Sequence, residues 1–226
     1  MLRRAIVLLL SLLAVIAVVV IAIVVRVTTP EGKLPDTFEQ ALVDALDASE
    51  VVASHDAGLG RWEHPVNVAP PEARVTLADG VTVDAGSRLI QTLIAVSTDH
   101  DQSLPAFEFQ RPEGGATLRV EGNLADETVA DLVDLASALD EIDRPVDDDS
   151  VGFTIATSGN DAAPTVTVRT RIRSDQMRDA DEDQRAEVAE ELGYVAFCDA
   201  VADLARTRVT NAATTTQCTA GSYTIS

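Results

Sequence analysis

The residues best suited to binding a metal ion lie close together near residue 60. His55, Asp56, Glu63 and His64 fall within ten residues, and Gly58-Leu59-Gly60 between them is typical of a turn. A hairpin about this turn would bring the four side chains together, and imidazole and carboxylate groups are ligands of divalent transition metals. The alternative is that they are solvent-facing polar residues on a surface ribbon.

A stripe of arginines marks a second candidate site. In the segment Thr165–Arg173 apolar or β-branched residues alternate with polar ones, and Arg169, Arg171 and Arg173 fall on one side. If the apolar side packs on helices, the arginines face outward and form a recognition surface for an anionic protein or envelope polymer. The alternative is that acidic residues on neighbouring strands pair with them.

Cys198 and Cys218 are the two cysteines of the chain. Their spacing fits no zinc or redox motif, and an even count favours a disulfide in an oxidising compartment. The bond would close a loop of about 20 residues. Two unrelated buried thiols are the alternative.

Known catalytic and cofactor motifs are absent from the sequence. It holds no G-x-S-x-G, H-E-x-x-H or glycine-rich phosphate loop, and three histidines leave few bases for proton transfer. No cofactor is therefore expected.

Helical and strand periodicities alternate along the chain and must position these residues. Apolar residues at helical spacing predict helices over residues 34–48, 86–98, 126–139 and 183–206, the last with a bend at Gly193. Alternating patterns predict strands over residues 51–57, 62–68, 74–77, 106–110, 116–121, 151–157, 165–173, 208–212 and 222–225.

The order of these elements predicts an α+β fold. The order α-β-β-α-β-β occurs twice, which indicates a two-layer sandwich, an antiparallel sheet with helices on one face, possibly built as two ferredoxin-like halves. The predicted division is an anchor at residues 1–28 and halves at 29–124 and 125–226, or one continuous domain after the anchor.

The N-terminus carries a predicted transmembrane helix. Ala5–Val25 is free of charge, and at 1.5 Å per residue it spans about 31 Å, the thickness of a bilayer core. Bulky residues and Arg26 follow it where a cleaved signal peptide would have small ones, so an uncleaved anchor is favoured. Arg3 and Arg4 precede the helix, which favours a cytoplasmic N-terminus and an extracytoplasmic C-terminal domain in the plasma membrane.

The charge of the chain restricts its partners. The 226 residues carry 37 Asp and Glu against 17 Lys and Arg, a net charge of −20, and every acidic residue follows the apolar run. Such a field repels nucleic acid and anionic lipids, and it keeps an exported domain soluble.

Two functions from different classes agree with these features. The first is a membrane-anchored, extracytoplasmic interaction or accessory domain of the cell envelope. The second is an extracytoplasmic metal-dependent hydrolase that uses the hairpin with His55 and His64. The missing catalytic motifs favour the first.

We predict that the apolar segment stays on the mature protein and holds it in the membrane. Intact-mass measurement of membrane-extracted protein should find the N-terminal residues present. A mature N-terminus after Arg26 would show instead that the segment is a cleaved signal.

Overall fold

In the computed structural model, helices alternate with pairs of strands along the described residues, which are 36–56, 72–112, 114–145, 151–158 and 163–225. The helices are α2 (Asp36–Asp47), α3 (Val83–Asp99), α4 (Asp126–Glu141), α5 (Asp175–Asp179), α6 (Arg185–Glu191) and α7 (Tyr194–Arg208). The strands are β1 (Val52–Asp56), β2 (Glu72–Leu77), β3 (Ala106–Gln110), β4 (Ala116–Val120), β5 (Val151–Ser158), β6 (Thr165–Ile172), β7 (Ala213–Ala220) and β8 (Tyr223–Ile225). This order confirms the predicted α+β class.

All eight strands form one sheet, in which their order follows the chain from β1 to β8. The two strands of each hairpin pair antiparallel, whereas strands joined by a helix, such as β2 and β3 or β4 and β5, pair parallel. The expectation of an antiparallel sheet was therefore wrong, and the sheet is mixed. The reason is that each helix carries the chain back along its length, so the next strand starts at the same end as the last one.

The strand order also corrects the expectation of ferredoxin-like halves. A split βαβ unit would place a further strand between the two strands that its helix connects. Here β2 and β3, joined through α3, are direct neighbours, as are β4 and β5, joined through α4. The β4–β5 pair also makes the strands of residues 29–124 and 125–226 continuous.

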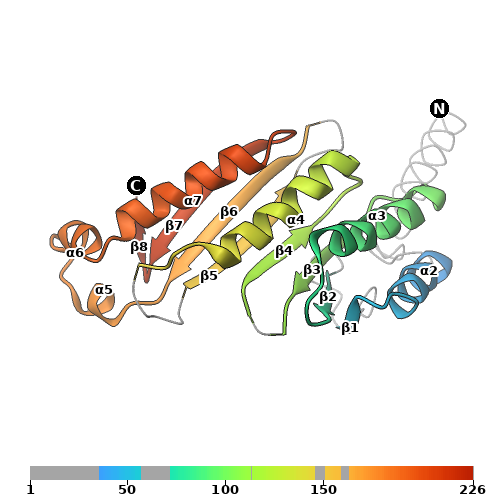
Figure 1. Cartoon of the computed structure of the whole chain (residues 1–226), viewed down its shortest axis with the longest axis horizontal. Coiled ribbons are helices and arrows are strands. Elements are labelled where there is room, and N and C mark those ends of the chain that lie inside the picture. The colour runs from blue at the N-terminus through green and yellow to red at the C-terminus, as the bar shows by residue number, and fades with distance from the viewer. Residues whose placement is uncertain (1–35, 57–71, 113, 146–150, 159–162, 226) are drawn as a thin grey trace, which may run out of the picture.

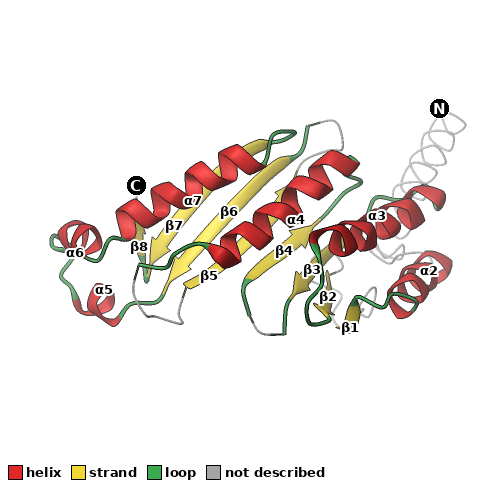
Figure 2. Cartoon of the chain, in the orientation of Figure 1, coloured by secondary structure: helices red, strands yellow, loops and turns green. Residues whose placement is uncertain are grey.

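The helices α2, α3, α4 and α7 lie on one face of the sheet (Figures 1 and 2). The helix α4 packs against both α3 and α7, which places these three crossover helices in one layer. Because the strand direction reverses at each hairpin, the β4–β5 crossover has the opposite hand to the β2–β3 and β6–β7 crossovers. The opposite face, which we call the open face, is not covered by any of these helices (Figure 2).

The core lies between the helix layer and the sheet. Strands contribute alternate residues to it, and helices contribute residues three or four positions apart, as their periodicities predict. Its largest fully buried side chains are Phe38, Leu42, Leu46, Leu93, Leu104, Phe107, Leu132, Leu135, Leu139, Phe153 and Ile155.

The C-terminal region agrees with the sequence prediction in one place and differs from it in another. The predicted bend at Gly193 separates α6 from α7, and this glycine has a left-handed backbone with a φ of 73°. The predicted strand at 208–212 is wrong, because α7 extends to Arg208 and a turn follows. Asp131 of α4 accepts hydrogen bonds from Thr210 N at 2.9 Å and Asn211 Nδ2 at 3.1 Å, which stabilises this turn.

The predicted disulfide is present. Cys198 on α7 and Cys218 on β7 are bonded, with their Cα atoms 6.0 Å apart. The bond ties the last long helix to the sheet.

The predicted anchor, residues 1–28, and the predicted strand at 62–68 lie outside the described residues. Among the helices that the structure does describe, none is both long and apolar enough to cross a membrane.

Replacing both cysteines with alanine should lower the free energy of unfolding by about 3 kcal/mol, because the unfolded chain loses the closure of its loop. Urea denaturation of the full chain without reductant measures the difference. Reductant should lower the stability of the wild type to that of the variant and leave the variant unchanged. A wild type that is insensitive to reductant would contradict a stabilising role for the bond.

Candidate functional site

The alternation along β6 divides its side chains between the two faces of the sheet. Val166, Val168, Thr170 and Ile172 are buried against the helix layer. Arg169 and Arg171 are exposed between them, and since successive residues point to opposite sides, both lie on the open face. Arg173 follows the end of the strand and is also exposed.

The register of the strands identifies the neighbours of these arginines. Arg169 lies between Thr154 of β5 and Gln217 of β7. Arg171 lies between Gly152 of β5 and Thr219 of β7. None of the four neighbours carries a carboxylate, and among the described residues neither Arg169 nor Arg171 forms an ion pair.

The other end of the open face has a different composition. One row across β1 to β4 alternates in charge, with Asp56, Arg74, Glu108 and Arg119 paired in register. Arg74 Nε lies 3.7 Å from Glu108 Oε1. The cross-strand pairing that was the alternative for the arginine stripe therefore describes β1–β4 but not Arg169 and Arg171.

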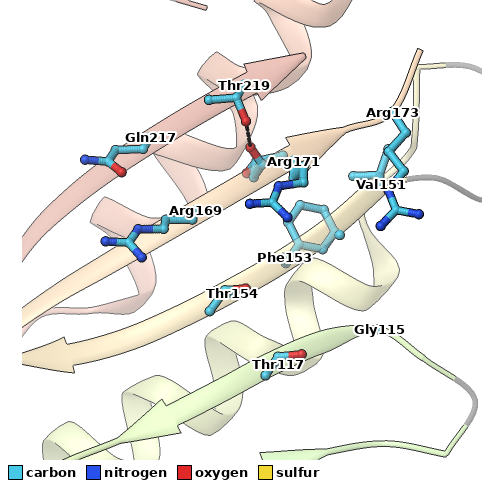
Figure 3. Close-up of a pocket in the computed structure, with 12 residues that line it drawn as sticks. Gly115, Thr117, Val151, Phe153, Thr154, Arg169, Arg171, Arg173, Gln217 and Thr219 are labelled. Carbon is cyan, nitrogen blue, oxygen red and sulfur yellow. Dashed lines mark hydrogen bonds between the residues drawn. The ribbon is translucent and has the colours of Figure 1, made fainter. Parts of the chain in front are cut away.

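A shallow hollow of about 620 Å³ lies on the open face over β4 to β7, and we call it the arginine hollow. Figure 3 shows Arg169, Arg171 and Arg173 on the side of the strands that faces away from the helices, beside Thr154 and Thr117. Gly152 deepens its floor, since a Cβ built there meets no atom within 4 Å.

Gly115 forms the rim of the arginine hollow where β4 begins. Its φ of 110° is rarely adopted by other residues, and a Cβ there would lie 2.6 Å from Asp140 Oδ1. Asp140, on α4, accepts hydrogen bonds from Ala116 N at 2.7 Å and from Arg111 Nη1 at 2.8 Å. The helix layer thus fixes the start of the strand that borders the hollow.

The side chains that line the arginine hollow can bind anionic groups through hydrogen bonds. Guanidinium groups donate hydrogen bonds in a planar fork that matches carboxylate and phosphate oxygens. The threonine and glutamine side chains nearby add neutral donors and acceptors. The described residues that line the hollow include no His, Cys, Asp or Glu, so they offer no general base or thiol nucleophile.

The structure describes half of the predicted metal site. His55 Nε2 lies 2.9 Å from Asp47 Oδ1, at the end of α2. Asp56 points to the opposite side of β1. Glu63 and His64 lie outside the described residues, so the metal hypothesis stays a prediction. Within the described part of the chain no three His, Cys, Asp or Glu side chains are grouped to hold a metal ion.

Comparisons of the chain with protein-family models, with curated proteins and with solved structures find no match. The functional interpretation therefore depends on the site itself.

Proposed function

We propose that this protein is a membrane-anchored, extracytoplasmic accessory domain of the cell envelope, and that it binds an anionic partner in the arginine hollow. The observation that carries the proposal is the pair of exposed arginines, Arg169 and Arg171, whose strand neighbours are all uncharged. In a chain with a net charge of −20, two cations that have no acidic partner among the described residues contribute little to stability, and a ligand accounts for them.

The location follows from two other features. Residues 5–25 have the length and composition of a membrane span. The Cys198–Cys218 disulfide fits an oxidising compartment, such as the outer side of the plasma membrane. Both favour an exported domain held close to the bilayer.

The net charge limits how such a site works. At a distance the negative field repels an anion, and salt screens that repulsion beyond about 8 Å. Affinity therefore depends on contacts inside the hollow, where bidentate hydrogen bonds from guanidinium groups act at short range. A partner with several anionic groups gains most from two adjacent arginines.

The double substitution Arg169→Gln/Arg171→Gln should weaken binding of a fluorescent poly-glutamate chain to the full-length protein in neutral detergent by at least about tenfold. The free energy of unfolding should change by less than about 0.5 kcal/mol, because the substitutions remove no ion pair between described residues. Arg74→Gln/Arg206→Gln removes the same charge from the far end of the sheet and from α7, and it should bind as the wild type does.

A third variant separates binding from stability. Gly152→Ile fills the floor of the hollow where a side chain meets nothing, so it should block binding while stability holds or rises by about 0.5–1 kcal/mol. Polyphosphate in place of poly-glutamate shows which anion the hollow prefers. Equal weakening of poly-glutamate binding by the two double arginine variants would refute the proposed site. A loss of stability without a loss of binding in Arg169→Gln/Arg171→Gln would refute it as well.

A further inference from the structure

Beside the arginine hollow, the outer edge of β7 is only partly paired. The short strand β8 pairs with Cys218, Thr219 and Ala220. Residues Ala213–Gln217 pair with β6 on their other side, and within the described part of the chain no strand pairs with their outer edge. The described residues therefore leave the outer edge of Ala213–Gln217 unpaired, in line with β8.

The backbone groups at this edge point outward. Ala213 N donates to Pro164 O and Gly221 N donates to Ile172 O, both on the β6 side. Because backbone groups alternate in direction along a strand, the N–H and C=O groups of Thr214 and Thr216 point away from β6. Native sheets usually protect such an edge with charged residues, proline or a covering element. The segment Ala213–Gln217 has no charge and no proline.

A second hollow, of about 190 Å³, lies at this edge on the helix side of the sheet. Val195 and Ala202 of α7 and Ile225 of β8 contribute apolar surface to it, and Thr216 borders it. A strand added beside β7 would direct every second side chain here. The apolar lining favours an aliphatic side chain, and Asp199 in the same lining disfavours an acidic one.

The other side chains of an added strand would lie on the open face, next to Thr215 and Gln217. Gln217 is in register with Arg169, so the added strand would run two strand spacings, about 10 Å, from the arginine. An extended arginine side chain and an extended glutamate side chain can together cover this distance. The edge thus favours an acidic residue opposite Gln217 on the open face and aliphatic residues on the helix side.

We propose that the partner is an extended polypeptide that adds to the sheet beside β7, antiparallel to it and in line with β8. Its side chains alternate between aliphatic, toward α7, and polar on the open face, with an acidic side chain opposite Gln217 directed toward Arg169. The inference deepens the proposed function and rests on it. Backbone hydrogen bonds to Thr214 and Thr216 provide affinity, and the two faces provide selectivity, as in other β-strand additions.

The probe for this inference is a labelled, end-capped peptide Glu-Val-Glu-Val-Glu, titrated against the full-length protein in neutral detergent. The residues opposite Thr214 and Thr216 share their face, so they are the valines, and they exchange N–H and C=O bonds with the edge. Methylating the valine nitrogens should therefore weaken binding at least about tenfold, whereas methylating glutamate nitrogens, which point outward, should have little effect.

Two proline variants test the same edge on the protein. Thr216→Pro removes an outward N–H and should also weaken peptide binding about tenfold, since edge positions tolerate proline. Thr224→Pro is the matched control: Thr224 lies opposite Thr219, whose backbone groups face β6, so its own N–H faces away from β7. Melting temperatures identify any variant that is misfolded, and the methylated peptides test the edge without changing the protein.

The outcomes separate this inference from the proposed function. In one outcome, Arg169→Gln/Arg171→Gln abolishes peptide binding, whereas valine methylation and Thr216→Pro leave it unchanged. This result would overturn strand addition but would still support the anion site. No peptide binding while poly-glutamate still binds would do the same. The wild-type protein could instead dimerise without peptide while the Thr216→Pro variant is monomeric. This result would show that a second copy of the chain occupies the edge, and it would overturn the peptide as occupant.

Discussion

The fold depends on one constraint, that every crossover helix returns to the same face of the sheet. Each hairpin is antiparallel, each helix then joins it to a parallel neighbour, and the strands follow one another in chain order. The helices α3, α4 and α7 pack side by side on one face, and none of the three covers the other face. Packing of the core therefore does not determine which side chains occupy the open face.

The two ends of the open face carry different side chains. Across β1 to β4, acidic and basic residues alternate in register, as in the Arg74–Glu108 pair. These opposite charges on neighbouring strands neutralise each other. Across β5 to β7 the face holds threonine, glycine and glutamine around Arg169 and Arg171. Among the described residues no carboxylate pairs with these two cations, and for this reason we propose a bound anion. The same strands end at the half-paired edge of β7, so the two candidate surfaces adjoin.

Much of the helix and strand content could be predicted from the sequence, because a buried face imposes a period on both. The segment Val166–Ile172 shows this, since its alternation alone indicated that Arg169 and Arg171 share a side. Their neighbours could not be predicted, because register depends on how whole strands align and a slip of one residue exchanges the faces. The start of β7 was missed for another reason. Its sequence, Ala-Thr-Thr-Thr-Gln, lies at an exposed edge and shows no apolar alternation, while Arg208 continues the helix before it.

Hydrogen exchange can locate the proposed anion on the sheet, since a ligand bound over β5 to β7 slows exchange where it covers the backbone. Full-length protein is exchanged with and without poly-glutamate, and the protection of each peptide is compared. We expect slower exchange at the edge and strand ends within 151–173 and 213–220, with 72–77 and 106–110 unchanged. Protection gained in the charged row of β1 to β4, or spread evenly over the chain, would contradict it.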